Sequence, residues 1–209
     1  METEIKRPVK NRIQKRAQRT HNRLKKAALD VFSEKSVDAA TIEEITKRAD
    51  LGKGTLYEHF NDKEDIVTTL VDEAISHLIE KMRLEKHPGR LEDMLEHLID
   101  AHYRFYIDSK EEFLLLFQGK LLLKLESDTP YELEQPFLRY LREIEKLVSG
   151  YLSAKIDSKK IRRFACAVAG FSFGFFSFAM IGMTTDEIQT SIKPLRRVFV
   201  ESLVTFLGR

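Results

Sequence analysis

Apolar residues recur at intervals of three and four along most of the chain, which is the spacing of one face of an α-helix. The first such stripe is formed by Leu24, Ala27, Ala28, Val31 and Phe32. Further stripes and capping signals predict two short helices within residues 41–60 and longer helices over 63–86, 90–108, 109–125, 130–155, from about 158, and over 184–207. Because no convincing strand pattern interrupts them, the sequence predicts an all-α fold of about nine helices.

The stretch from Thr41 to Phe60 has the pattern of two short helices packed across each other. Thr41 and Glu44 are spaced as a capping box, and Asp50-Leu51-Gly52 breaks the first stripe with residues typical of a turn. The face of the second helix that does not carry the apolar stripe presents hydrogen-bond donors, namely Lys53, Thr55, Tyr57 and His59. This is the pattern of a helix-turn-helix, whose second helix can enter the major groove of DNA.

The same stretch resembles the N-terminal signature of the tetracycline-repressor-like (TetR) regulators. The matching residues are Thr41-Ile42-Glu43-Glu44-Ile45, Ala49, Gly54-Thr55-Leu56-Tyr57, His59-Phe60 and Lys63-Glu64, and the likeness extends back over residues 23–34. Two positions differ, because the family often has glycine where Asp50 stands and serine or threonine where Gly52 stands. The resemblance implies an N-terminal three-helix DNA-binding domain followed by a helical domain that binds an effector and forms a dimer.

The resemblance also implies which residues contact DNA, and the chemistry of their side chains agrees with it. Family members commonly contact phosphates from the positions of Thr41, Tyr57, His59 and Lys63, and approach the bases from those of Lys53, Gly54 and Thr55. Phosphates need donors and positive charge, and base edges are read from the start of the recognition helix. Two other interpretations remain open, namely that Tyr57 is a core residue with its hydroxyl at the edge and that Lys53 is a solvated lysine.

Charge is distributed unevenly along the chain. Residues 1–63 hold 15 Lys and Arg against 10 Asp and Glu, a net charge of +5, and the remaining residues hold 20 against 23, a net charge of −3. This fits a DNA-binding domain over 1–63 joined to a part that avoids DNA, and the resemblance implies that this part, residues 64–209, is the effector-binding and dimerisation domain. The basic segment 1–22, with Pro8 near its start, has two interpretations: a disordered tail, or an arm that touches phosphates or the minor groove.

Residues 164–185 contain no charged side chain over 22 positions, a length that would span a bilayer. Serines and three glycines interrupt this run, so burial between subunits is favoured over a membrane span. The resemblance implies a homodimer in which the last two helices of each copy form a four-helix bundle. The residues predicted to form this interface are Ala167, Gly170, Gly174, Ser177, Val198, Leu203 and Phe206.

The resemblance further implies a cavity among the helices from 90 to 180 that binds a small-molecule inducer. Aromatic residues at helical spacing are the candidates for its walls, and plain core positions are the alternative interpretation. The candidates are Tyr103, Phe105, Phe113, Phe117, Phe137, Tyr140, Phe171 and Phe175. Apolar and aromatic walls favour a hydrophobic or aromatic ligand over a sugar or a nucleotide.

Signals for catalysis or metal binding are weak. Asp93, His97 and Asp100 share a helix face, but a solvated polar face explains them more simply than a metal site does. The sequence contains no phosphate-binding glycine loop and no nucleophile elbow, so we expect neither enzyme activity nor a cofactor. The single cysteine, Cys166, is expected to be a buried thiol, and the lack of an internal disulfide suits a reducing cytoplasm.

These patterns predict a cytoplasmic, homodimeric transcriptional regulator that binds double-stranded DNA. Its simplest form is a repressor that an apolar effector releases from a palindromic operator. The alternative is an accessory protein of the same fold that recruits a protein partner instead of sensing a ligand. A cavity in the second domain favours the repressor, and a solidly packed second domain favours the accessory protein.

Overall fold

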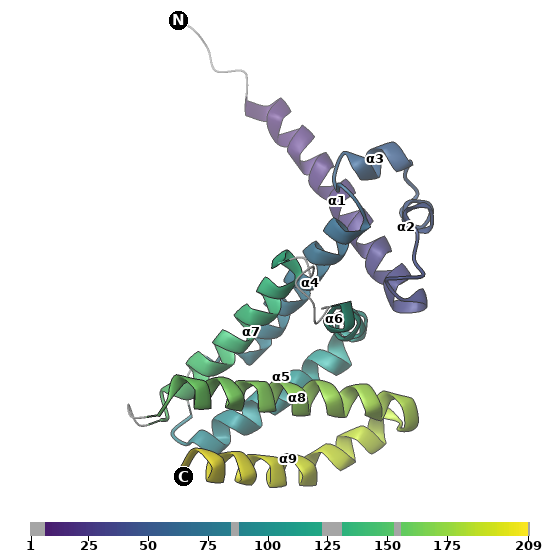
Figure 1. The fold of residues 1–209 in the computed structure, drawn as a ribbon. Coiled ribbons are helices and arrows are strands. Elements are labelled where there is room, and N and C mark those ends of the chain that lie inside the picture. Colours follow the sequence, from purple (N-terminus) through teal and green to yellow (C-terminus); the bar gives the residue numbers. More distant parts are fainter. Residues whose placement is uncertain (1–6, 85–87, 123–130, 153–155, 209) are drawn as a thin grey trace, which may run out of the picture. The chain divides into compact units, whose positions relative to one another are not determined.

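The computed structural model describes residues 7–84, 88–122, 131–152 and 156–208, and these ranges are helical almost throughout (Figure 1). The helices of this part of the chain are α1 (Arg7–Lys35), α2 (Ile42–Arg48), α3 (Lys53–Tyr57), α4 (Lys63–Met82), α5 (Leu91–Asp108), α6 (Lys110–Leu122), α7 (Tyr131–Ser149), α8 (Ser158–Gly182) and α9 (Thr185–Gly208). The predicted all-α fold and the predicted number of helices are confirmed. Backbone contacts divide the chain into two compact units, Met1–Leu70 and Val71–Arg209, so the division falls inside α4.

The first unit has a small apolar core to which each of its helices contributes. α1 packs on α2, and α2 packs on α3. Side chains that are fully enclosed include Leu24, Phe32, Ile45, Leu56 and Ile66. All five lie on the stripes that the spacing of apolar residues predicts, so the inward face of each helix in this unit was predicted correctly.

The basic N-terminal segment is helical from Arg7, which contradicts a disordered tail over residues 7–22, whereas contact with phosphates or the minor groove stays a prediction. The structure has neither a tail nor an extended arm over residues 7–22, because α1 already begins at Arg7. Pro8 lies in the first turn, where the missing N–H has no intrahelical acceptor to lose, and most of the residues that follow are good helix formers. The helix presents the exposed cations Arg12, Lys15, Arg16 and Arg19, whereas residues 1–6 lie outside the described residues.

Side-chain caps begin several helices where the sequence predicts them. The Thr41 hydroxyl accepts from the Glu44 amide at 3.3 Å, and the Glu44 carboxylate accepts from the Thr41 amide at 3.1 Å. Reciprocal bonds of the same kind link Thr184 and Glu187 before α9. The capping boxes predicted for Thr41 with Glu44 and for Thr184 with Glu187 are therefore confirmed, whereas the Glu112 carboxylate, predicted to close a box with Ser109, lies 2.7 Å from His77 Nδ1. The cap predicted at Thr129 lies outside the described residues, and α7 begins at Tyr131.

In the second unit the apolar run forms α8, which packs against α5, α7 and α9 (Figure 1). Its inward face buries Phe164, Val168 and Phe176. By length and composition α8 is also apolar enough to cross a membrane, a property that it shares with buried helices of soluble proteins. Its packing against three helices accounts for the apolar residues of one side, whereas Phe178 and Ile181 are exposed.

The C-terminal half of α4 belongs to the second unit. Leu78 and Met82 are enclosed there. Polar contacts fix the same half-helix, since Lys81 Nζ lies 2.9 Å from the Asp108 carboxylate of α5 and His77 Nδ1 lies 2.7 Å from the Glu112 carboxylate of α6. The predicted extent of this helix, to about Lys86, is too long, because α4 ends at Met82.

Candidate nucleic-acid interface and effector pocket

The turn between α2 and α3 is held by the backbone and by one arginine of α1. Asp50 has a φ of 51°, in the left-handed region where glycine is favoured and aspartate is tolerated. This explains physically why the family often has glycine at this position. Arg23 Nη2 donates to the Ala49 carbonyl at 2.6 Å, so the guanidinium ties α1 to the end of α2. The result is a compact helix-turn-helix in which α3 is the second helix.

Helix α3 buries one side and exposes the other. Leu56 is enclosed in the core of the first unit, whereas Tyr57 is 57% exposed. Lys53 and Gly54 are exposed as well, and a Cβ added to Gly54 meets no atom within 4 Å. Tyr57 is therefore a surface residue and not a core residue. A donor-bearing, open face at the start of α3 is the arrangement that the DNA-binding prediction requires.

Two of the predicted DNA contacts already have partners in the DNA-free chain. Lys63 Nζ lies 2.9 Å from the Val37 carbonyl, 3.0 Å from that of Ala40 and 3.3 Å from that of Asp38. These three carbonyls account for all three donors of an ammonium group. The Thr41 hydroxyl caps α2, as described above. Both residues hold the helix-turn-helix in shape, which sequence reasoning alone did not anticipate for Lys63.

Lys53 and His59 have looser surroundings. Lys53 Nζ lies 3.3 Å from the Glu43 carboxylate of α2, in a pair in which both side chains are more than half exposed. Such a pair contributes little to stability and is easily exchanged for another anion. The His59 ring lies 5.7 Å from that of His21, which in turn stacks on Phe60 at 4.6 Å between ring centres.

The second unit contains an apolar pocket of about 320 Å³ between α6, α7 and α8. It is lined by Leu116, Glu134, Phe137, Leu138, Tyr140, Leu141, Cys166, Ala169, Gly170 and Phe173. Phe137 and Tyr140 are the two predicted ligand residues that the structure brings together here. Phe173 and Glu134 also line the pocket and were not predicted. We call this cavity the effector pocket.

The other predicted ligand residues lie elsewhere in the second unit. Phe105 and Phe113 are at most 2% exposed and belong to the core. Phe171 stacks on Phe199 of α9 at 4.1 Å and on Phe175 at 6.1 Å, on the side of α8 that faces α9. Tyr103 lines a different groove, and Phe117 is half-buried outside the lining of the pocket. Helical spacing showed which aromatics share a face, but not which neighbouring helix that face meets.

A buried hydrogen-bond chain ends at Tyr140, which lines the effector pocket. His102 Nδ1 lies 2.6 Å from the Leu98 carbonyl, and Nε2 lies 2.5 Å from the Tyr140 hydroxyl oxygen. Burial lowers the pKa of His102 to about 4, so the imidazole is neutral at neutral pH. Burial also raises the pKa of Tyr140 well above its ordinary value, which keeps the phenol protonated.

Cys166 corrects the prediction of a buried thiol. It is exposed and lines the effector pocket. The sequence surrounds Cys166 with apolar residues, but on a helix only the neighbours at i±3 and i±4 share its face. The face of α8 that carries Cys166 opens onto the pocket and not onto the core. The single thiol of the chain is therefore placed where a bound ligand would cover it.

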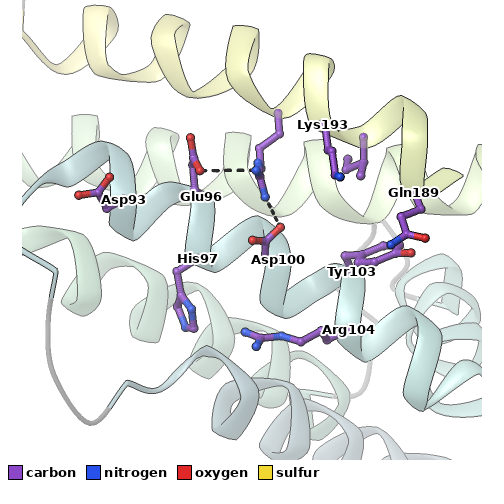
Figure 2. Close-up of a pocket in the computed structure, with 10 residues that line it drawn as sticks. Asp93, Glu96, His97, Asp100, Tyr103, Arg104, Gln189 and Lys193 are labelled. Atoms are coloured by element: carbon purple, nitrogen blue, oxygen red, sulfur yellow. Dashed lines mark hydrogen bonds and ion pairs between the residues drawn. The ribbon is translucent and has the colours of Figure 1, made fainter.

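A second, polar groove of about 590 Å³ lies between α5 and α9 (Figure 2). Arg196 of α9 pairs there with the carboxylates of Glu96, at 3.5 Å, and Asp100. The suggested metal-binding face is not assembled, because His97 turns to the Met82 carbonyl, 3.0 Å from its Nε2. Within the described ranges, no three metal-ligating side chains come together. The mixed charges of this groove make it unsuitable for an apolar effector.

Large apolar side chains are exposed on α8, on α9 and in the turn between them. Exposed large side chains there are Phe178, Ile181, Met183, Leu195, Val198 and Phe206. Two residues predicted to form the dimer interface are instead buried within the single chain, because Ser177 bonds the Phe173 carbonyl and Leu203 faces the core. Gly170 lines the effector pocket, Val198 and Phe206 are exposed, and Ala167 and Gly174 are half-buried.

Comparison with known proteins agrees with this architecture. Residues 24–70 match the family model described as bacterial regulatory proteins, tetR family. The HTH-type transcriptional regulator YvdT of Bacillus subtilis is 26% identical over 127 residues, which are 59% of this chain and 64% of YvdT. IcaR of Staphylococcus epidermidis, the negative regulator of the biofilm operon icaADBC, is 28% identical over 64% of this chain and 68% of its own length.

Among solved structures, the regulator FadR from Bacillus subtilis in complex with stearoyl-CoA has a TM-score of 0.69, with 19% identity over 88% of this chain and 97% of that one. At this identity the likeness concerns the fold, which has the same arrangement along nearly the whole chain. Three observations agree with one another: the helix-turn-helix formed by α2 and α3, the match of residues 24–70 to the family model, and the shared fold. Residues 24–70 are a DNA-binding domain of the tetR family of bacterial regulatory proteins, and the chain shares its fold with the regulator FadR.

Proposed function

We propose that the protein is a homodimeric transcriptional repressor that binds a palindromic operator and leaves it when an apolar effector binds. The observation that carries this proposal is the exposed, donor-bearing face of α3, with Lys53, Gly54 and Tyr57 on one side of the helix and Leu56 anchored on the other. A recognition helix in a major groove uses such a face for base edges and phosphates. In this proposal the protein acts in the cytoplasm and catalyses no reaction.

The exposed apolar side chains of α8 and α9 support the dimer. Six large apolar side chains are exposed on these helices and in the turn between them, and an accumulation of exposed apolar residues is typical of a protein interface. Two copies joined by a two-fold axis would present their α3 helices to two half-sites, so the operator would be an inverted repeat.

Lys63 is then best described as a residue that positions the helix-turn-helix. Any contact between Lys63 and a phosphate would replace one of its hydrogen bonds to the carbonyls.

The effector pocket supports regulation by a ligand. Its lining is mostly apolar and aromatic, and it opens next to the only cysteine of the chain. The complex of the Bacillus subtilis FadR with stearoyl-CoA shows that this fold accepts a ligand with a long apolar chain in that protein.

The second candidate function is an accessory protein that recruits a protein partner. It is supported by the polar groove between α5 and α9, whose charged walls suit a polar protein surface better than a small apolar molecule.

Selection of bound duplexes from a random DNA library by the full-length protein tests the proposal. We expect enrichment of an inverted repeat, with half-sites about one helical turn or more apart. Tyr57→Ala should lower the affinity for the selected duplex, whereas Tyr151→Ala, in the second unit, should not. Enrichment of a single half-site would contradict the dimeric form of the proposal, and retention of random sequence alone would contradict sequence-specific regulation.

A further inference from the structure

The hydroxyl of Tyr140 has one proton, and Tyr140 already donates it in a hydrogen bond to His102. A backbone carbonyl only accepts hydrogen bonds, so the 2.6 Å contact between His102 Nδ1 and the Leu98 carbonyl places a proton on Nδ1. In a neutral imidazole Nε2 is then an acceptor, and the Tyr140 hydroxyl, 2.5 Å away, must be its donor. Any hydrogen bond between this hydroxyl and a ligand in the effector pocket must therefore be donated by the ligand.

Glu134 is the other polar side chain of the pocket wall that bears on ligand choice. Its carboxylate accepts hydrogen bonds only, and it forms no hydrogen bond or ion pair with any residue that the structure describes. The lining contains no lysine, arginine or histidine among the described residues. A ligand carboxylate or phosphate at this wall would meet a like charge without a counter-ion, which disfavours its charged form.

The rest of the wall favours positive charge. Phe137, Tyr140 and Phe173 contribute aromatic rings, and the Tyr140 and Phe173 rings lie 5.9 Å apart in an edge-to-face arrangement. Aromatic faces attract a cation, the more so where water is excluded. The apolar side chains Leu116, Leu138 and Leu141 would cover a hydrocarbon chain or ring.

We propose that the effector pocket takes a lipophilic amine, with the protonated nitrogen against Glu134 and the apolar body among the aromatic rings. This inference rests on the proposed function, since it names the ligand class of the same site. It predicts a preference opposite to that for fatty acids and other apolar anions. Stearoyl-CoA, seen in the structural neighbour, carries phosphates, so this chain would differ from that neighbour in the polar head that it accepts.

Cys166 provides the readout, because it is the only cysteine in the chain, is exposed and lines the pocket. The rate of its alkylation by N-ethylmaleimide is measured at increasing concentrations of decylamine, decyltrimethylammonium, decanol and decanoate, all below the concentrations at which they form micelles. Decylamine has charge and donor, the quaternary ion has charge alone, and decanol has a donor alone. We expect decylamine to protect Cys166 at a ~10-fold or greater lower concentration than decanoate.

Two variants separate the carboxylate of the pocket from the overall charge. Glu134→Gln should bring the protection by both cations to within ~3-fold of that by decanol, whereas Glu111→Gln, an exposed carboxylate of α6 outside the lining, should leave the ranking unchanged. Equal or better protection by decanoate in the unaltered protein would overturn the inference and leave the pocket as an effector site. Protection by none of the four compounds would overturn the effector site together with it. The ranking in the unaltered protein decides the matter even if a variant fails to fold.

Discussion

Arg139 of α7 holds Asp72 of α4 through an ion pair in which Nη1 donates to the Asp72 carboxylate at 2.9 Å. The other terminal nitrogen donates to the Asp72 carbonyl at 3.1 Å and to the Ser76 hydroxyl at 2.9 Å. One planar guanidinium thus fixes a single turn of α4. Because α7 also carries Phe137 and Tyr140, this contact links the wall of the effector pocket to the helix whose first residues belong to the first unit.

Arg139→Gln is expected to weaken the coupling between effector and operator. The variant should bind a Cys166-protecting ligand within ~2-fold of the unaltered protein, but the factor by which saturating ligand weakens operator binding should fall ~5-fold, about 1 kcal/mol of coupling. Fluorescence anisotropy of a labelled operator, with and without the ligand, measures both quantities. Arg83→Gln serves as the control, because Arg83 pairs locally with Glu80 at 2.8 Å. An unchanged factor in Arg139→Gln would show that α7 does not transmit the signal.

Gly54→Ala should separate the stability of α3 from its binding to DNA. A Cβ at this position meets no atom within 4 Å, and alanine stabilises a helix by ~0.5–1 kcal/mol relative to glycine. We therefore expect a higher unfolding midpoint of the free protein. If the backbone of Gly54 lies against DNA, operator affinity should nevertheless fall by ~10-fold or more. Thermal unfolding and anisotropy titrations of the same preparations test this, and a more stable variant with unchanged affinity would remove Gly54 from the interface.

Lys53→Ala should reveal whether this lysine reads a base. If it does, the preference at one position of each half-site should relax at a cost of ~1–3 kcal/mol, whereas a phosphate contact would lower affinity equally for all sequences. Titrations against operators with every single-base substitution in one half-site distinguish the two results. Glu43→Gln is the matched variant, because it removes the carboxylate 3.3 Å from Lys53 Nζ and should leave affinity equal or higher.

The sequence was most informative where structure depends on neighbours within a few residues. The capping boxes of Thr41 and Thr184 and the inward positions of Leu24, Ile45 and Leu56 follow from spacing alone. The left-handed turn at Asp50 is likewise marked by a residue that tolerates it. The helix-turn-helix is built almost entirely from such local relationships, and this is why its residues were the most predictable part of the chain.

Predictions failed where the outcome depends on which helices meet. Phe137 and Phe105 are both aromatic residues on amphipathic helices, yet one lines a pocket and the other is enclosed in the core. Lys63 finds its three carbonyl partners in the loop that follows α1, more than twenty residues earlier in the chain. Neither distinction is encoded in helical periodicity, because periodicity specifies a face of one helix but not the partner of that face.

The buried pair of His102 and Tyr140 should make the stability of the protein depend on pH in a defined direction. The pKa of His102 is about 4 in the folded chain, below its ordinary value of 6.5. Between these values the unfolded chain binds a proton that the folded chain does not, so this contribution to stability is complete above about pH 6.5 and is lost as the pH falls towards 4. The expected loss is about 3 kcal/mol.

Urea unfolding at pH 7, 5.5 and 4 measures this loss. In the double variant His102→Leu with Tyr140→Phe, both partners of the hydrogen bond are replaced by apolar side chains, which is far less damaging than removing one of them. The free energy of unfolding of the double variant should then decrease by about 3 kcal/mol less over the same pH range. Parallel decreases in the two proteins would assign the pH dependence to other groups.

Val198→Glu should dissociate the proposed dimer. Val198 of α9 is 62% exposed in the single chain, and Phe178 and Ile181 of α8 are exposed as well. A carboxylate buried there without a partner would cost several kcal/mol, enough to shift micromolar protein to monomers. Sedimentation velocity measures the state of association, and operator affinity should fall ~100-fold because the two half-sites would no longer be bound by one particle. Gln189→Glu introduces the same charge on α9 within the polar groove and should remain dimeric. If Val198→Glu remained dimeric, the two-fold axis would not pass through this surface. The spacing expected between the two half-sites would then change as well.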